Sequence, residues 1–191
     1  MRKLFCLTVL FLALVAGNQS VAQSGYQINV KIDGLSDSTA YLAYYYGKGQ
    51  YYRDTTKISS SGEITFTGKD SLEHGMYSII TGQKRWFDFM VDNQKISLTT
   101  DTLYTILNMK VKGSEETTIF YEYLSFLNER QSTARKLNEK KNNGTEKEKE
   151  AAVEALAKLD TEVKEYIANF HVKNKESFTS NFIYAVEYPN V

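Results

Sequence analysis

The sequence predicts an α+β fold, in which an antiparallel, β-sandwich-like sheet of about eight strands is followed by an α-helical hairpin and a short third helix. Between residues 25 and 112, short segments of alternating apolar and polar residues are separated by turn residues, as in half-buried strands. After Gly113 the apolar residues recur at steps of three and four, as on one face of a helix. The chain also holds 14 Tyr and 10 Phe but one Pro, a composition that favours strands.

The segment Asp54–Gly68 carries the clearest hairpin signal. A Ser-Ser-Gly turn occupies residues 60–62, where Gly62 is free to adopt a positive φ. Ile64 and Phe66 then alternate with polar residues that face the other way. Because a lone hairpin is marginal in water, it requires a larger sheet. We expect strands at residues 26–33, 39–46, 50–58, 63–67, 76–81, 85–91, 95–100 and 107–112, arranged as an antiparallel sandwich or a curled open sheet.

The helical segment begins with capping signals. Ser114 is a suitable N-cap, and the two glutamates that follow it lie where the helix dipole favours carboxylates. An Asn-Asn-Gly triplet at residues 142–144 ends this helix, and Thr145 with Glu148 forms a capping box for the next. We expect these two helices to pack as an antiparallel hairpin and a third helix to occupy residues 177–186.

The first 22 residues have the features of a signal peptide. Arg2 and Lys3 precede a mostly apolar run of about 13 residues, which is too short to span a bilayer. Small residues at the end of the segment predict cleavage between Ala22 and Gln23. Cys6, the only cysteine, lies within the apolar run, so we expect the exported product to contain neither a disulfide nor a thiol.

These features divide the chain into three parts. We expect the signal peptide at residues 1–22, an antiparallel β domain at 23–113 and a helical segment at 114–191 that is truncated before a downstream domain. Removal of Arg2 and Lys3 from the 23 basic residues leaves 21 against 23 acidic ones, a net charge of −2. This balance argues against nucleic acid as a partner, since phosphate binding requires a clustered basic excess. The mature chain is expected in the periplasm or cell envelope, with no transmembrane segment after signal cleavage.

Several short motifs of the β region occur in a characteristic order. They are Gly25-Tyr26-x-Ile28, Ile32-x-Gly34-Leu35, Ala40-Tyr41-Leu42 followed by tyrosines, Asp54-Thr55, and Ser61-Gly62-x-Ile64-x-Phe66-x-Gly68. In this order they resemble the β-rich N-terminal domain of unknown function of Bacteroidetes-type thiol:disulfide interchange proteins. The resemblance covers residues 25 to about 112, and the helices after Ser114 are similar in placement and character.

In that family, a signal peptide, the β domain and a helical segment precede a C-terminal thioredoxin-like domain with a Cys-x-x-Cys motif. The resemblance therefore implies that this chain is the N-terminal part of an envelope thioredoxin-like disulfide oxidoreductase. The sequence contains no Cys-x-x-Cys motif, so none of the family's catalytic residues can be assigned to a position in it. Any disulfide chemistry would belong to the parent protein, and the enzymatic status of the chain itself stays open.

Four aromatic residues form the candidate binding surface, namely Tyr44, Tyr45, Tyr51 and Trp86. Alternation along their strands forces some tyrosine rings outward, where they could stack on a sugar or a peptide. Cross-strand aromatic contacts within the sheet are the alternative. Trp86 shares a strand face with Asp88 and Met90 by alternation. We expect the helices to cover that face, with a partner site as the alternative.

The two histidines give no signal for catalysis or metal binding. Neither His74 nor His171 has a ligand or triad partner at motif spacing. We therefore predict no catalytic, cofactor-binding or metal-binding residues, and no cofactor. A hydrolase would require a Ser or Thr hydroxyl in a cleft, within hydrogen-bond reach of one of these histidines.

The sequence thus favours a secreted, non-catalytic accessory or interaction module. Its expected partner is another protein or its own downstream thioredoxin-like domain, and a homodimer is a further option. The alternative is a stand-alone envelope protein that binds a peptide or a glycan through the tyrosine strands or Trp86.

Overall fold

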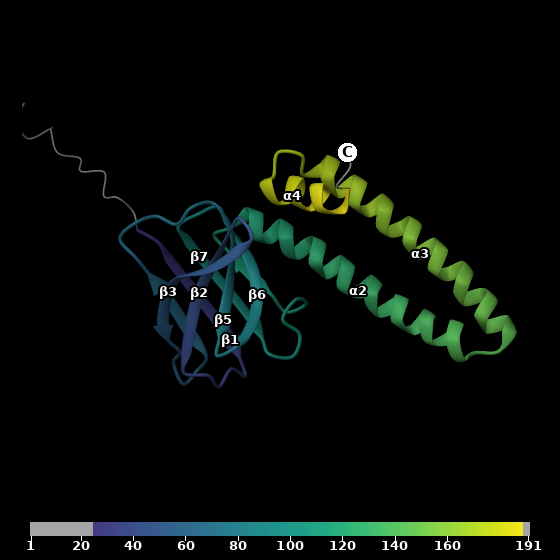
Figure 1. The fold of residues 1–191 in the computed structure, drawn as a ribbon, viewed down its shortest axis with the longest axis horizontal. Helices are drawn as coiled ribbons and strands as arrows, with labels where there is room; N and C mark the ends of the chain where they lie inside the picture. The colour runs from purple at the N-terminus through teal and green to yellow at the C-terminus, as the bar shows by residue number, and fades with distance from the viewer. Residues whose placement is uncertain (1–24, 189–191) are drawn as a thin grey trace, which may run out of the picture.

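The computed structural model describes residues 25–188, so the predicted signal peptide at residues 1–22 lies outside the described residues. A β-sandwich is followed by three helices, none of which, among the described residues, is both long and apolar enough to cross a bilayer (Figure 1). The strands are β1 (Gln27–Asp33), β2 (Thr39–Tyr46), β3 (Gly49–Lys57), β4 (Glu63–Thr67), β5 (Gly75–Thr81), β6 (Lys84–Val91), β7 (Lys95–Asp101) and β8 (Lys110–Lys112). The helices are α2 (Glu115–Asn143), α3 (Glu146–Lys173) and α4 (Phe178–Glu187).

The described strands form two four-stranded sheets, in the orders β4-β1-β7-β8 and β3-β2-β5-β6. Neighbouring strands are antiparallel except for the parallel pair β1 and β7. This pair arises because the chain crosses to the second sheet for β5 and β6 before it returns as β7 beside β1. The α+β class, with eight strands followed by a helical hairpin and a short helix, is confirmed.

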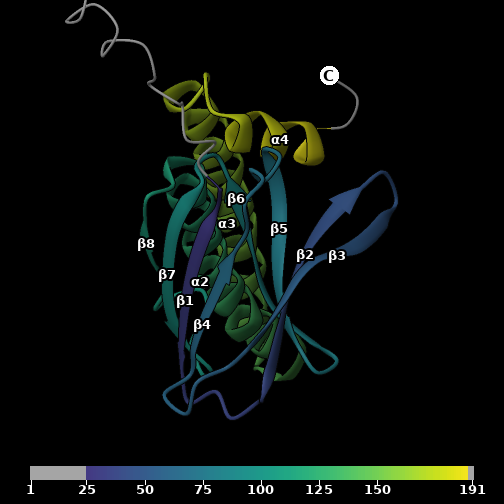
Figure 2. The same cartoon turned by 90° about the vertical axis from the view of Figure 1, so that its left-hand side faces the viewer.

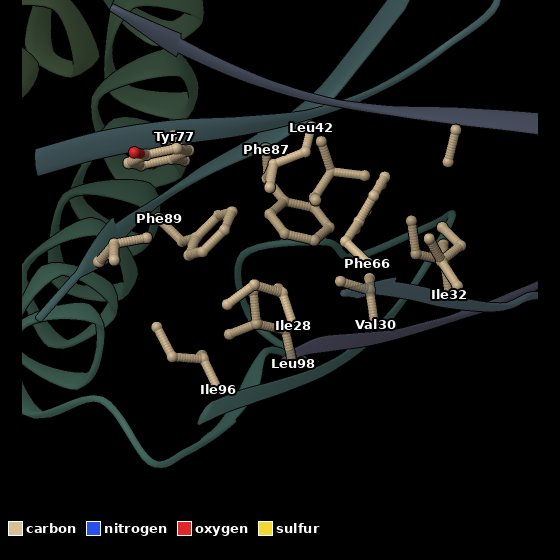
Figure 3. Packing of buried hydrophobic residues seen from close by; sticks show 14 of the residues in the cluster. Ile28, Val30, Ile32, Leu42, Phe66, Tyr77, Phe87, Phe89, Ile96 and Leu98 are labelled. Carbon is tan, nitrogen blue, oxygen red and sulfur yellow. The ribbon is translucent and has the colours of Figure 1, made fainter. Parts of the chain in front are cut away.

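The two sheets pack face to face through the apolar residues that alternate along their strands (Figure 3). On one side, Ile28 and Ile32 of β1 and Phe66 of β4 are fully buried. On the other side, Leu42 of β2 and Phe89 of β6 are fully buried as well. Because complete burial of one such side chain contributes about 1.5–3 kcal/mol, this core is the main source of stability in the sandwich.

Two glycines permit close approaches of the backbone that a side chain would prevent. Gly62, in the turn before β4, has a φ of 79°, and a Cβ there would collide with the carbonyl oxygen of Ile32. Gly113, between β8 and α2, has a φ of 82°, and a Cβ there would collide with the carbonyl oxygen of Lys95. The positive φ expected at Gly62 is therefore confirmed, and Gly113 sets the direction in which α2 leaves the sandwich.

The strand predicted at residues 107–112 is shorter in the structure, because β8 contains only three residues. The carboxylate of Asp101 accepts hydrogen bonds from the backbone N–H groups of Leu103 (2.8 Å) and Tyr104 (2.6 Å). These bonds close a turn immediately after β7. Leu107 consequently lies in a loop, where it is half-exposed, and pairs with no strand.

The first turn of α2 is anchored to β6 by hydrogen bonds. Ser114 is the N-cap, and its hydroxyl accepts a hydrogen bond from the N–H of Thr117 at 3.0 Å. The carbonyl oxygen of Met90 accepts from the hydroxyl groups of Ser114 (3.2 Å) and Thr117 (2.7 Å). The Thr117 hydroxyl also accepts from the N–H of Met90 at 3.0 Å. The predicted cap is confirmed, and it also satisfies the backbone of a strand at the edge of its sheet.

A second apolar cluster joins the outer face of β6 to the three helices. Met90 is fully buried there. It packs in one cluster with Phe120 and Tyr123 of α2, Phe170 of α3 and Ile183 of α4. The helical segment is therefore held by packing against the sandwich as well as by the hydrogen bonds at Met90.

Helices α2 and α3 form the predicted antiparallel hairpin, which extends away from the sandwich as an arm (Figure 1). The rings of Phe126 and Tyr166 stack with their centroids 3.5 Å apart, and the guanidinium of Arg130 lies 4.3 Å from the Phe126 centroid. At the start of α3, the carboxylate of Glu148 accepts from the backbone N–H of Thr145 at 2.8 Å, as the predicted capping box requires.

The predicted third helix is α4, and a carboxylate from α2 caps its N-terminus. Glu116 accepts hydrogen bonds from the backbone N–H groups of Phe178 (3.1 Å) and Thr179 (2.8 Å). The hydroxyl of Ser177 donates to the same carboxylate at 2.7 Å. Burial alone raises the pKa of a carboxyl group, but these hydrogen bonds outweigh it and lower the pKa of Glu116. A residue distant in sequence thus satisfies the free N–H groups of this helix end.

We predict that Phe66→Ala destabilises the sandwich by about 3–5 kcal/mol, because it leaves a cavity between the two sheets. Thr65→Ala, on the exposed face of the same strand, is the matched control and should cost less than about 1 kcal/mol. Urea unfolding of the chain that starts at Gln23 measures both. A loss below about 1 kcal/mol for Phe66→Ala would contradict the two-sheet core described here.

We also predict that Glu116→Ala loosens α4, with a cost of about 0.5–2 kcal/mol for the lost cap. Because the pKa of Glu116 is lowered in the folded chain, its stabilisation is fully present above the ordinary value near 4.5 and is lost as the pH falls through the lowered pKa. Hydrogen-exchange protection factors of the α4 amides should therefore fall on acidification in the wild type and stay low throughout in Glu116→Ala. Glu115→Ala, at the exposed neighbouring residue, should keep the pH profile of the wild type. Equal pH profiles of α4 protection in the wild type and in both variants would contradict the capping role of Glu116.

Candidate functional site

A row of aromatic rings crosses the second sheet from strand to strand. In order across β3, β2, β5 and β6, its members are Tyr51, Tyr44, Tyr77 and Phe89. Successive ring centroids are 5.8, 6.0 and 6.2 Å apart, within the range of favourable aromatic contacts. The row follows from the strand register, because each neighbouring pair lies directly opposite in an antiparallel ladder.

One end of this row is buried and the other is exposed. Phe89 and Tyr77 lie in the core, whereas Tyr51 is 51% exposed. Figure 2 shows the cause, since the far ends of β2 and β3 leave the sandwich as a two-stranded ribbon that the other sheet does not cover. Tyr46, near the tip of the ribbon, is 76% exposed. The aromatic surface of the core thus continues onto an open face.

This open face borders a cleft of about 690 Å³, which we call the tyrosine cleft. The loop between β4 and β5 and the first residues of β5 supply the rest of its lining. Cavities of about 300–1,000 Å³ are typical of ligand sites. The lining residues that carry aromatic or titratable groups include Tyr44, Tyr46, Arg53, Asp70, Glu73 and His74.

Behind the cleft, buried tyrosines are held in their protonated form. The hydroxyl of Tyr26 donates to the carboxylate of Asp54 at 2.7 Å, and the guanidinium of Arg53 lies 5.8 Å from the centroid of the Tyr26 ring. Burial, together with the hydrogen bond to Asp54, raises the pKa of Tyr26, and burial raises the pKa of Tyr77. These phenol groups therefore serve as hydrogen-bond donors and as apolar surface, and not as bases.

A second hollow, of about 320 Å³, shares His74 and Gly75 with the tyrosine cleft. Its lining includes Asp92, Glu115 and Glu116. One carboxylate oxygen of Asp92 accepts from the backbone N–H groups of Glu115 (2.9 Å) and Glu116 (3.1 Å) at the start of α2. The other oxygen, Oδ1, is buried and has no hydrogen-bond partner among residues 25–188. The second hollow is therefore strongly acidic.

Three of the four residues of the predicted binding surface come together in the structure. Tyr44 and Tyr45 line the tyrosine cleft, and Tyr51 packs against Tyr44. Tyr45 also accepts a hydrogen bond from Arg85 across the sheet. The cross-strand aromatic contacts given as the alternative are present, and Tyr44 and Tyr45 also line the cleft; binding of a sugar or a peptide by these rings stays a prediction.

Trp86 lies apart from the tyrosine cleft, beside the turn between β5 and β6. This turn follows Thr81, at the opposite end of β5 from the cleft. The indole N–H of Trp86 donates to the hydroxyl of Thr81 at 2.7 Å, and the ammonium of Lys84 lies 3.3 Å from the centre of the indole. The polar atom and one face of the ring are therefore already occupied within the chain.

Trp86 was expected on the same strand face as Asp88 and Met90, and this prediction is wrong because of a β-bulge. The register of β5 and β6 shifts between Ile79 and Ile80, and Trp86 is the residue left unpaired. Its ring packs against the core cluster between the sheets. Met90, in contrast, is covered by the helices as expected.

One serine lies near a histidine, at the junction of α3 and α4. The hydroxyl of Ser180 is 3.4 Å from Nδ1 of His171, whose ring stacks on Tyr184 with centroids 4.2 Å apart. Ser180 is buried in the first turn of α4, and it lines neither hollow described above. Because the Ser180 hydroxyl is buried and lies outside both hollows, we assign no reaction to the pair. Within residues 25–188, no three His, Cys, Asp or Glu side chains are grouped to hold a metal ion.

An apolar groove of about 540 Å³ lies between α2 and α3. Leu124 and Leu127 of α2 and Leu156, Leu159 and Val163 of α3 contribute to its lining. They belong to the apolar residues that recur at steps of three and four after Gly113. The groove shows that the seam of the hairpin is only partly closed.

A comparison with known protein families finds a match for the sandwich. Residues 26–120 match the family model described as Domain of unknown function (DUF4369). This segment is a β-rich domain of unknown function. The DUF4369 segment contains all eight described strands, the tyrosine cleft and the first turn of α2. No curated protein and no solved structure matches the chain.

The loop residues of the tyrosine cleft could not be found from the sequence. Asp70, Glu73 and His74 lie between two strands, in a segment without periodicity or a motif. Their position beside the tyrosine strands depends on the pairing of β2 with β5, which joins segments more than 30 residues apart. The DUF4369 segment therefore acquires its cleft only through the folded sheet.

The position of a residue along the aromatic row predicts how much unfolding free energy is lost when its ring is removed. Tyr77→Ala removes a ring that is 4% exposed and should cost about 3–5 kcal/mol in urea unfolding. Tyr51→Ala removes the half-exposed end of the row and should cost less than about 1.5 kcal/mol. Equal losses for the two variants would show that the ribbon is as tightly packed as the sandwich, contrary to the structure.

Proposed function

We propose that this chain is a non-catalytic interaction module of an exported protein and that it binds an extended polypeptide segment in the tyrosine cleft. The observation that carries the proposal is the aromatic row that runs from the core into the cleft. Phe89 and Tyr77 hold the row in place from within the sandwich, and Tyr44 extends it to the open ribbon. Rings fixed in this way lose little conformational freedom on binding, which favours affinity.

The free edge of the second sheet favours a polypeptide as the ligand. Among the strands that the structure describes, β3 is terminal in its sheet, and no described strand pairs with its outer backbone N–H and C=O groups. Extended peptides are commonly recognised by pairing with such an edge, while neighbouring pockets accept alternate side chains. The tyrosine cleft adjoins this edge through Arg53 of β3 and Tyr44 of β2.

A glycan is the second candidate for the same cleft, because exposed tyrosine rings also stack on sugars. The unpaired edge of β3 would then have no role in binding. We treat a glycan as an outcome of the binding experiment below.

The resemblance to thiol:disulfide interchange proteins supports a setting for this module. In our proposal it is the N-terminal accessory part of an envelope thioredoxin-like oxidoreductase, exported by the signal peptide at residues 1–22, and it presents polypeptide partners to that domain. The tyrosine cleft would supply the contact, and the parent protein would supply the disulfide chemistry.

Equilibrium binding to panels of labelled extended peptides and of soluble glycans tests the proposal, with the purified chain that starts at Gln23. We expect at least one peptide to bind, and Tyr46→Ala to weaken it about tenfold, as for an exposed aromatic contact of about 1–2 kcal/mol. Tyr104→Ala is the matched control, since Tyr104 is exposed on the loop after β7 and should leave binding unchanged. Binding of glycans alone, or peptide binding that is equal in both variants, would contradict the proposal.

A further inference from the structure

The charges around the tyrosine cleft are unbalanced. Asp70 and Glu73 line the cleft and, among the described residues, form no ion pair. Both are exposed, so their carboxylates are free to turn towards a ligand. The second hollow, which shares a wall with the cleft, adds the carboxylates of Asp92 and Glu115. Arg53 is the one Lys or Arg side chain in the lining of the two hollows.

Arg53 illustrates the attraction between a cation and an aromatic ring beside the cleft, and the ring that it covers, Tyr26, is buried and does not itself line the cleft. Its guanidinium lies over the Tyr26 ring, 5.8 Å from the centroid, and forms no ion pair with a described residue. The face of an aromatic ring attracts a cation through its quadrupole. Tyr44 and Tyr46 line the cleft itself, and Tyr46 is largely exposed. The cleft therefore offers both components of a cation site, namely aromatic faces and free carboxylates.

We infer that the segment bound in the tyrosine cleft carries an arginine or lysine side chain, whose charged end lies between the tyrosine rings and the carboxylates of Asp70 and Glu73. This inference rests on the proposed function and adds the chemistry of the ligand. The tyrosine rings of the cleft serve as the stacking surface, and the two carboxylates accept hydrogen bonds from the guanidinium or ammonium group. The neighbouring acidic hollow extends the attraction and steers basic segments towards the cleft.

Three labelled peptides test this inference by fluorescence anisotropy. In the first, valine alternates with arginine; in the second, citrulline, a neutral isostere, replaces arginine; in the third, glutamate replaces it. We expect the arginine peptide to bind about tenfold more tightly than the citrulline peptide, and the glutamate peptide to bind most weakly. The advantage should shrink as salt is raised, because these carboxylates are solvent-exposed.

The double variant Asp70→Asn/Glu73→Gln should bring the arginine and citrulline peptides to within about threefold of each other. The matched control, Glu139→Gln/Glu150→Gln, removes two exposed carboxylates near the turn between α2 and α3 and should keep the preference. If the arginine and citrulline peptides bind equally to the wild type and Tyr46→Ala weakens both, the inference of a cationic ligand is wrong and the proposed function stands. If the preference survives the double variant, the cation is bound elsewhere and the inference fails. If no peptide of either panel binds, the proposed function fails with it.

Discussion

The face-to-face packing of the two sheets is the constraint on which the rest of the structure depends. Phe66 and Phe89, both fully buried, come from strands of different sheets and meet in the same core cluster. The burial of both rings in one core requires alternation to hold in both strands, and it fixes which residues face outward. The outward face of β6 then presents Met90 to the helices, while Tyr44 of β2 packs against the core cluster and also lines the tyrosine cleft. The helical arm and the tyrosine cleft are therefore two consequences of one packing arrangement.

The tyrosine cleft lies where this packing stops. Within the core, an aromatic residue gains from complete burial, but at the ribbon the same residue type keeps one face free. The transition from Tyr77, which is buried, to Tyr51, which is half-exposed, takes place over two strand spacings in one sheet. Proteins rarely expose aromatic rings beside unpaired strand edges without a partner, because such surfaces promote association. This is the physical basis for our proposal that recognition takes place at the cleft.

Features that depend on neighbouring residues could be predicted from the sequence. The turn at Gly62 and the N-cap at Ser114 follow from local backbone geometry, and both are confirmed. Features that depend on distant pairing could not be predicted. The parallel pairing of β1 with β7 has no local signal, and neither has the bulge that separates Trp86 from Asp88. For the candidate site, the tyrosines were found because a two-residue turn brings β2 and β3 together, whereas the acidic loop residues were missed because only β2–β5 pairing places them there.

The anchoring of α2 at Met90 has a mechanical consequence. α2 contains 29 residues and, at about 1.5 Å per residue, extends for roughly 43 Å. Its hydrogen bonds to the sandwich come from its N-terminal end, through Ser114 and Thr117 at the Met90 carbonyl and through Tyr121 at the backbone of Asp88. Further along, Leu124 and Leu127 share the apolar groove with Ile106 of the loop between β7 and β8. A rod held so close to one end is a lever whose fulcrum is β6. A force applied at the tip of the arm would act on β6 increased by the ratio of the free length of α2 to its anchored length. The strand paired with β6 is β5, and the first residues of β5 line the tyrosine cleft.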